Sequence, residues 1–177
     1  MKRNILIFGL ILGAILATNV VIMMNRVYNN PDIQSNDVVG YAAMIIVFSL
    51  IFFGIRNYRN KELNGTITFG NAFKIGVLIA FVGSTMYVIV GLGYMYLAMP
   101  DFVDKYCMHV MIQATRNGAT EAELALKSQE MEQFKEMYKS PFFAILISYF
   151  EVLPVGLVVA LVSSLILKRK EQSVPVR

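Results

Sequence analysis

The residue with the strongest claim to chemistry is Glu151, which lies near the middle of an apolar stretch over residues 142–167. An ionisable side chain at such depth in a membrane is costly to insert and usually marks a functional site. Three residues later, Pro154 removes the backbone hydrogen bond to the carbonyl of Phe150, beside the carboxylate. A carboxylate next to a freed carbonyl is suited to binding a proton, a cation or an amine.

Three hydroxyl-bearing residues of an earlier apolar stretch fall at a similar depth when the two stretches are counted inward from opposite sides: Ser84, Thr85 and Tyr87. We expect them to hydrogen-bond Glu151, which together with Pro154 completes a candidate intramembrane polar site. Three interpretations of Glu151 remain open. It is a protonated clamp that joins helices by hydrogen bonds, an ionisable group that binds a proton or cation, or a side chain that faces lipid.

The remaining chemistry-bearing residues do not form a catalytic or metal-binding motif. Cys107 and Met111 share a helical face and offer soft sulfur ligands, but His109 points to another side, so no metal site is predicted. The sequence has one cysteine and one histidine. It also lacks a phosphate-binding loop, a paired zinc-ligand motif and a nucleophile elbow. We therefore expect no cofactor and no enzymatic activity.

Composition indicates a membrane protein. The 177 residues are 56% hydrophobic and 16% charged, with a mean hydropathy of +0.58, whereas soluble domains are about 25% charged. The length suits one integral membrane domain over residues 1–177. Ten of the 16 Lys and Arg residues lie in short segments beside the predicted spans. The net charge of +4 therefore reflects membrane topology and predicts no nucleic-acid partner.

Four stretches are long and apolar enough to cross a bilayer, which takes about 20 residues. The segment between the third and fourth is polar, its helical periodicity stops at Asn117-Gly118, and Thr120 and Glu123 form a capping box. The fold class is therefore all-α, a four-helix transmembrane bundle with an extracytoplasmic helical hairpin between spans 3 and 4. The expected spans are about 4–25, 38–55, 73–99 and 141–167, with the hairpin over 101–139 and a basic tail over 168–177.

Small residues on two of the predicted spans are expected to mediate helix packing. Small side chains at every fourth position let helix backbones approach closely. In the first span these are Gly9, Gly13 and Ala17, and in the fourth they are Gly156 and Ala160. The alternative is that glycine and alanine are simply common in membrane helices.

The distribution of positive charge predicts the orientation of the chain. Both termini and the loop between the second and third spans fall on one side of the predicted topology, and that side carries ten Lys and Arg residues. The opposite side carries six. Because positively charged loops stay in the cytoplasm, both termini are predicted to be cytoplasmic and the hairpin to face outward. The expected surroundings are the lipid bilayer, with a further copy of the chain or another membrane protein as a possible partner.

Three local stretches give the chain a family resemblance. They are residues 65–73, which read Gly-Thr-Ile-Thr-Phe-Gly-Asn-Ala-Phe, the Ser140-Pro141-Phe142 opening of the fourth span, and the basic tail. With this layout the sequence resembles a family of small bacterial four-span membrane proteins known only as a domain of unknown function. The resemblance implies a bacterial inner-membrane protein and brings no activity with it.

Two hypotheses about function therefore remain open. The first is a non-catalytic membrane component that assembles through helix packing. The second is a small transporter or channel subunit that uses Glu151 to bind a proton or cation. Four spans enclose little volume, so we expect transport to need an oligomer.

Overall fold

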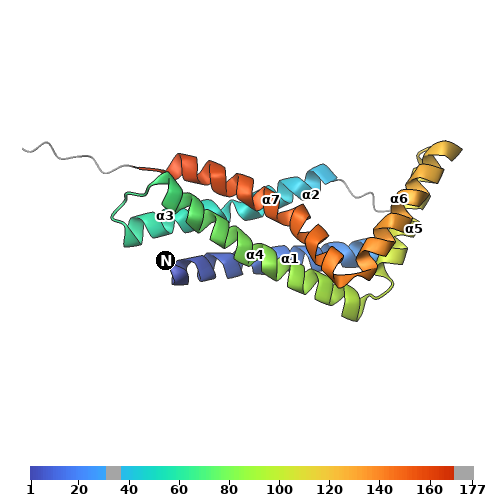
Figure 1. Ribbon diagram of the computed structural model, residues 1–177, viewed down its shortest axis with the longest axis horizontal. Coiled ribbons are helices and arrows are strands. Elements are labelled where there is room, and N and C mark those ends of the chain that lie inside the picture. The colour runs from blue at the N-terminus through green and yellow to red at the C-terminus, as the bar shows by residue number, and fades with distance from the viewer. Residues whose placement is uncertain (31–36, 170–177) are drawn as a thin grey trace, which may run out of the picture.

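The computed structural model describes residues 1–30 and 37–169. Within these ranges four helical stretches are long and apolar enough to cross a membrane: α1, α4, α7, and the stretch Val39–Glu62 that α2 and α3 form together. A hairpin of two further helices projects from one end of this bundle (Figure 1). The predicted all-α bundle with a helical hairpin is confirmed. The helices are α1 (Lys2–Asn29), α2 (Asp37–Phe48), α3 (Leu50–Glu62), α4 (Phe69–Ala98), α5 (Phe102–Arg116), α6 (Glu121–Lys139) and α7 (Pro141–Leu167).

The second span differs from its predicted form because it breaks at Ser49 and continues to Glu62 rather than ending at residue 55. The Ser49 hydroxyl donates a hydrogen bond of 2.6 Å to the carbonyl of Ile46. The Ser49 amide reaches the carbonyls of both Ile45 and Ile46, at 3.0 and 3.2 Å. Serine back-bonding of this kind bends helices. The polar residues after position 55 then extend α3 beyond its apolar part.

The other spans match their predicted positions more closely. α1 and α4 begin before the expected residues 4 and 73, and α7 begins and ends as expected. α4 starts early because the Thr68 side chain accepts a hydrogen bond from the amide of Asn71 and caps the helix. Asn64 and Gly65 have positive φ angles of 49° and 86° and form the tight turn before it. The cap and the turn before α4 are made by polar residues and glycine, and hydropathy alone does not reveal them.

The two most extensive helix–helix interfaces are those of α4 with α1 and of α4 with α7 (Figure 1). The small residues of α1 lie at the first of these interfaces. A Cβ atom on Gly9 would lie 2.7 Å from the Cβ of Val82, and one on Gly13 would lie 2.8 Å from the Cβ of Met86. Ala17, one turn further along, is buried. The two helices are therefore close because α1 has no side chain in the way.

The small residues of α7 lie at the second interface. A Cβ atom on Gly156 would lie 2.6 Å from the ring of Phe48 and 3.0 Å from the Cβ of Ala80. One turn on, a Cβ on Gly76 would lie 2.9 Å from that of Ala160. Both predicted stripes thus pack against other helices of the same chain.

The hairpin of α5 and α6 is built as its sequence suggests. Gly118 ends the turn with a φ of +80°, and the Thr120–Glu123 capping box opens α6. Lys135 joins the two helices through an ion pair of 3.0 Å with Asp104. These predicted caps and the turn are confirmed, and they hold the hairpin together outside the apolar bundle.

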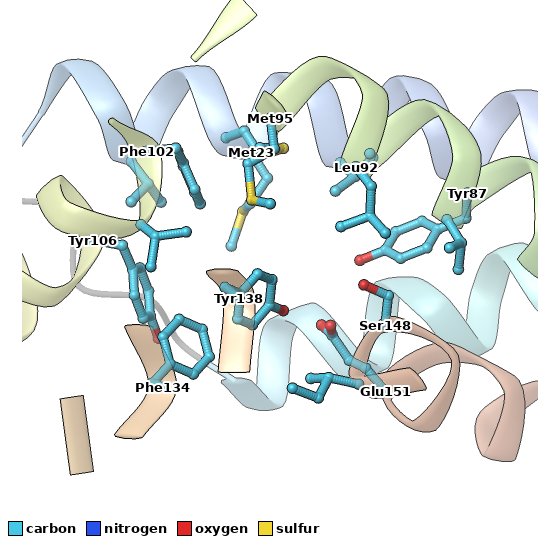
Figure 2. A pocket seen from close by; sticks show the side chains of 17 residues that line it. Met23, Tyr87, Leu92, Met95, Phe102, Tyr106, Phe134, Tyr138, Ser148 and Glu151 are labelled. Carbon is cyan, nitrogen blue, oxygen red and sulfur yellow. The ribbon is translucent and has the colours of Figure 1, made fainter. Parts of the chain in front are cut away.

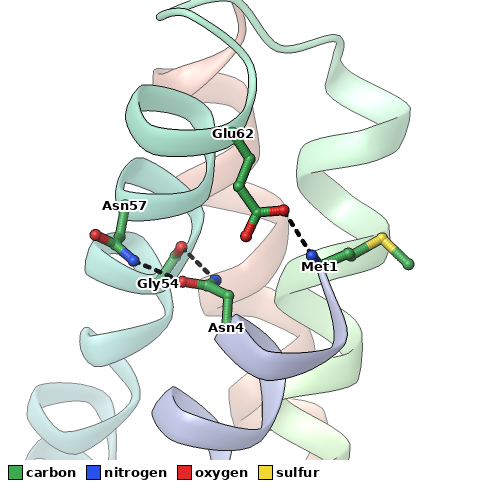
Figure 3. A network of polar contacts seen from close by, with 5 residues as sticks. All are labelled: Met1, Asn4, Gly54, Asn57 and Glu62. Carbon is green, nitrogen blue, oxygen red and sulfur yellow. Dashed lines mark hydrogen bonds and ion pairs between the residues drawn. The ribbon is translucent and has the colours of Figure 1, made fainter.

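The bundle has two ends, which we call the terminal end, where α1 begins and α7 ends, and the hairpin end (Figure 1). At the terminal end the Asn4 amide donates to the carbonyl of Gly54 at 2.9 Å, and the Asn57 amide donates to the Asn4 side chain at 2.7 Å (Figure 3). Beside them the Met1 ammonium lies 2.6 Å from the Glu62 carboxylate. These contacts tie α1 to α3.

The chain after α7 also binds the terminal end. Ile67 and Arg169 exchange backbone hydrogen bonds of 3.0 and 2.8 Å in an isolated antiparallel bridge, and the Arg59 guanidinium donates to the carbonyl of Leu167. The start of the predicted basic tail is therefore fixed to the loop before α4. Residues 170–177 of that tail lie outside the described residues.

Large apolar side chains cover the outside of the spanning helices. Leu97, Phe150 and Ile46 are 88%, 78% and 71% exposed. An apolar surface of this extent is unfavourable in water and suits the hydrocarbon core of a bilayer. The protein is a multi-pass membrane protein.

Candidate functional site

A cavity of about 470 Å³ lies at the hairpin end, between α1, α4 and α7 of the bundle and both hairpin helices (Figure 2). Most of its lining is aliphatic, aromatic or methionine side chains. Among the described residues that line it, Glu151 is the only charged one. Its size and apolar character are typical of small-molecule sites, which combine an apolar wall with a few placed polar groups.

Four side-chain oxygen-bearing groups point toward one another at one end of the cavity (Figure 2). α4 supplies Tyr87, α6 supplies Tyr138, and α7 supplies Ser148 and Glu151. Ser148 and Glu151 are three residues apart, so the helix places them on one face. Glu151 is exposed at the rim of the cavity, whereas Ser148 and Tyr87 are buried. The result is one carboxylate facing three hydroxyl groups.

The phenol of Tyr138 is a donor at neutral pH. Burial and, to a lesser extent, the charge of Glu151 raise the pKa of Tyr138 to about 12, against the opposing effect of a hydrogen bond with Ser148. The hydroxyl therefore keeps its proton throughout the physiological range. A neutral phenol donates a hydrogen bond to a carboxylate and offers its oxygen and ring face to a cation.

The other end of the cavity is lined by rings and methionines. Phe102, Tyr106, Phe134 and Tyr138 form a chain of stacked or tilted rings, which we call the aromatic wall. Their centroids are 6.4, 5.6 and 4.5 Å apart in that order. Met23 and Met95 face the wall from α1 and α4 (Figure 2). Tyr138 belongs to both ends, because its ring is in the wall and its hydroxyl is beside Glu151.

The structure brings together only part of the polar site expected from the sequence. Tyr87 and Glu151 line the cavity, but Ser84, Thr85 and Pro154 do not. Successive residues of a helix are separated by about 100°, so Thr85, two residues before Tyr87, points to the opposite side of α4. Pro154 follows Glu151 by three residues on α7 and is exposed, but its side chain is not part of the cavity lining.

The two remaining hydroxyl residues on α4 have other surroundings. Thr85 donates to the carbonyl of Phe81 at 2.7 Å and accepts a hydrogen bond of 2.8 Å from Tyr149. Ser84 is fully buried, and its hydroxyl has no hydrogen-bond partner in residues 1–30 and 37–169. Neither residue meets the carboxylate of Glu151 in the cavity.

Two members of the polar group were not predicted. Ser148 lies one helical turn before Glu151, and that spacing alone is enough to nominate it. Tyr138 had no comparable signal, because it reaches Glu151 only when the hairpin folds back on the bundle. The Tyr96 hydroxyl donates a hydrogen bond of 2.7 Å to the Tyr138 carbonyl, which helps to hold Tyr138 against the bundle.

The sulfur and imidazole groups of the hairpin lie apart from the cavity. Cys107 contacts the carbonyl of Met131 at 3.8 Å, and His109 is buried with no hydrogen-bond partner for Nδ1 in the described part of the chain. Nowhere in residues 1–30 and 37–169 do three or more His, Cys, Asp or Glu side chains gather as metal ligands would.

Comparison of the chain with curated protein sequences and with solved structures found no match. The family model described as "Protein of unknown function (DUF4199)" matches residues 7–169. The matched range contains the hairpin, α2 to α7, nearly all of α1 and all four residues of the polar group. The chain with its Glu151 cavity therefore belongs to the DUF4199 family of proteins of unknown function.

Proposed function

We propose that this protein binds a proton or a cation at Glu151 and acts as a subunit of a small transporter or channel in the bacterial inner membrane. The observation that carries the proposal is the convergence of Tyr87, Tyr138, Ser148 and Glu151 at one end of a cavity of about 470 Å³ (Figure 2). A carboxylate supplies the charge, and the hydroxyls replace part of the water that a cation leaves behind. The role is non-enzymatic, and no cofactor is part of it.

The competing hypothesis is a non-catalytic component that assembles through its small-residue stripes. Gly9 and Gly13 lie against α4, and Gly156 and Ala160 lie against α2 and α4 of the same chain. These stripes are therefore not open to a partner. The cavity is the better basis for a function. Because the cavity lies at one end of the bundle, a path across the membrane requires a second copy of the chain or another membrane protein.

The proposed orientation places both termini in the cytoplasm and the hairpin outside. It rests on the excess of Lys and Arg on the side of the termini. A reporter that is active only in the cytoplasm is expected to give signal when inserted after Lys170 and none at Asn117. The reverse pattern would overturn the orientation and place the cavity at the cytoplasmic side.

The role of Glu151 can be tested without knowing the ligand, by following thermal unfolding of the purified protein in neutral micelles from pH 5 to pH 9. If Glu151 exchanges a proton in this range, the midpoint of the wild type changes with pH and that of Glu151→Gln does not follow it. The rest of the chain is the same in both proteins, so the difference between the two profiles isolates Glu151. Glu130→Gln, an exposed carboxylate of α6, is the matched control and is expected to follow the wild type.

The structural clamp predicts a different result. A protonated clamp keeps its hydrogen bonds in Glu151→Gln, so the wild-type and Gln profiles would coincide at every pH. Glu151→Leu would then be less stable by about 1–2 kcal/mol, because hydrogen-bond partners lose their counterpart. This combination would overturn the proposed proton or cation binding.

A further inference from the structure

The aromatic wall narrows the kind of cation that suits the cavity. It stands on the hairpin side, with Tyr138 next to Glu151 and Phe134 4.5 Å from Tyr138 between ring centroids. We propose that the cavity binds an organic ammonium ion, with the charged nitrogen between Glu151 and the ring of Tyr138 and the apolar body against the aromatic wall and the methionines. This inference rests on the proposed function and specifies its ligand class.

The lining favours a cation over an anion. Glu151 is the only charged side chain among the described residues of the lining. Aromatic faces carry negative potential, which attracts ammonium groups within about 6 Å of the ring centroid. Carboxylate and ring faces therefore act in the same direction. The same carboxylate and the same ring faces would repel an anion.

The composition of the lining also favours an organic ion over a metal ion. A hard divalent cation takes six or more oxygen ligands, often including two or more carboxylates. The polar end of this cavity offers one carboxylate and three neutral hydroxyls, and most of the remaining volume faces carbon and sulfur. A metal ion would leave that apolar volume empty. An organic ammonium fills it and keeps its charge at the polar end.

A second cavity, of about 310 Å³, adjoins the first from the side of the hairpin. The two share Met95, Val103 and Tyr138 in their linings. The second cavity carries the carboxylates of Asp104, Glu132 and Glu136 and the ammonium groups of Lys135 and Lys139. Lys135 pairs with Asp104, and Lys139 pairs with Glu136. Three carboxylates against two lysines leave a small excess of negative charge, so an ammonium ion can come from water through this second cavity. It can also belong to a lipid headgroup that reaches the cavity from the bilayer.

Calorimetric titration of the purified protein in a neutral detergent tests the inference directly. Benzyltrimethylammonium is the probe, and neopentylbenzene is the uncharged molecule of the same shape. Potassium ion tests an inorganic cation. Dihexanoyl phosphatidylcholine presents the same ammonium group on a lipid headgroup, with dihexanoyl phosphatidylglycerol as its control. Circular dichroism establishes that each variant remains folded.

Benzyltrimethylammonium is expected to bind the wild type, and Glu151→Gln is expected to weaken this binding at least tenfold. Phe134→Leu and Tyr106→Leu keep apolar bulk but lose a ring face, which is expected to reduce affinity roughly three- to tenfold. Phe150→Leu is the matched control, because Phe150 is on α7 beside Glu151 but faces outward at 78% exposure. It is expected to bind as the wild type does.

The possible outcomes separate the two levels of the proposal. Binding of the phosphatidylcholine alone supports the ammonium chemistry and assigns its source to lipid. Equal binding of neopentylbenzene, or unchanged binding by Glu151→Gln, overturns the inference. Absence of ammonium binding together with a Glu151-dependent pH profile or potassium binding overturns the ligand class and leaves the proposed function standing. Absence of all of these overturns both.

Discussion

The two ends of the bundle are made from the same long helices but have different interiors. Toward the terminal end the core contains Ile51, Ile55, Ile75 and Ile79, which are at most 1% exposed. At the hairpin end a small separate cluster of methionines takes their place, and beside it lies the cavity. β-branched side chains have few rotamers, whereas methionine is flexible and adapts to irregular spaces.

The spacing between α1 and α4 also differs between the two ends, and it is tighter at the terminal end. Near the terminal end a Cβ on Gly9 would lie 2.7 Å from Val82, which is closer than real atoms approach. Toward the hairpin end a Cβ on Gly91 would lie 3.6 Å from Val20, an ordinary contact. The helices are therefore pressed together at one end and less tightly at the other. This contrast shows how one bundle can hold a rigid base and a site that accommodates a ligand.

The largest expected effect comes from a pair of glycine substitutions at the α1–α4 interface, which tests this contrast. Gly9→Ala puts a methyl group into a contact that cannot hold it, and we expect a loss of about 1–3 kcal/mol in unfolding free energy. Gly91→Ala adds the same group where there is room, so it is expected to be neutral or to stabilise by up to about 1 kcal/mol through helix propensity. Denaturant unfolding in micelles measures both. Equal losses would show that the two ends are packed alike.

The elements that could be predicted from the sequence are those with local signals. The apolar lengths predicted four spans, and Gly118 with the Thr120–Glu123 capping box predicted the hairpin. The break at Ser49 was missed, because one serine in an apolar run looks the same in a straight helix and in a bent one. Its effect depends on whether its hydroxyl bonds back to the preceding turn.

The candidate site could be predicted only in part, for a related reason. Glu151 stands out in any reading of the chain, because it is a charge within an apolar run. Its neighbours depend on helix rotation, which selected Tyr87 over Thr85, and on tertiary folding, which brought Tyr138 from the hairpin. Depth along a span gives no information on rotation. A helical-wheel comparison of α7 would have found Ser148, but no local pattern identifies Tyr138.

A smaller effect is expected from the buried hydrogen bonds of α1. Asn4→Leu removes the bond to the Gly54 carbonyl and the partner of Asn57 (Figure 3), and it is expected to cost about 1–2 kcal/mol. At the hairpin end of the same helix, Asn25→Leu removes a part-buried bond of 2.9 Å to Tyr94. Its expected cost is about 0.5 kcal/mol. Thermal unfolding of both variants compares the ends, and a larger loss for Asn25→Leu would reverse the assignment of the rigid base.

The hairpin itself is expected to open locally when its cap is removed. Thr120→Ala breaks the capping box and is expected to cost about 1 kcal/mol. The chain's only cysteine, Cys107, is 3% exposed, and burial raises the pKa of its thiol. Labelling by a maleimide therefore reports opening, and about 1 kcal/mol corresponds to a roughly fivefold faster rate. Thr115→Ala, which loses only a bond to its own helix at Met111, is the control. Equal rates in the two variants would mean that the cap does not secure the hairpin.

The smallest expected effect is a pH-dependent one, where the hairpin docks on α1. The Tyr28 hydroxyl donates a hydrogen bond of 2.9 Å to the Asp101 carboxylate. Lys105 lies 3.3 Å from that carboxylate and 3.5 Å from the centroid of the Tyr28 ring. The hydrogen bond from Tyr28 and, to a lesser degree, the charge and hydrogen bond of Lys105 lower the pKa of Asp101 below its ordinary value of 3.8.

A carboxyl whose pKa is lower in the folded state stabilises that state above its unfolded pKa, and this contribution is lost as the pH falls through the folded value. Tyr28→Phe is therefore expected to lower the unfolding temperature slightly at pH 6, and the difference from the wild type is expected to shrink below about pH 4. Circular dichroism melts of both proteins between pH 6 and pH 3 measure it. Other carboxyl groups titrate in both proteins and cancel in the difference. A difference that stays constant over this range would mean that Tyr28 supports the hairpin by packing alone, and that docking at the hairpin end does not depend on the Asp101 charge.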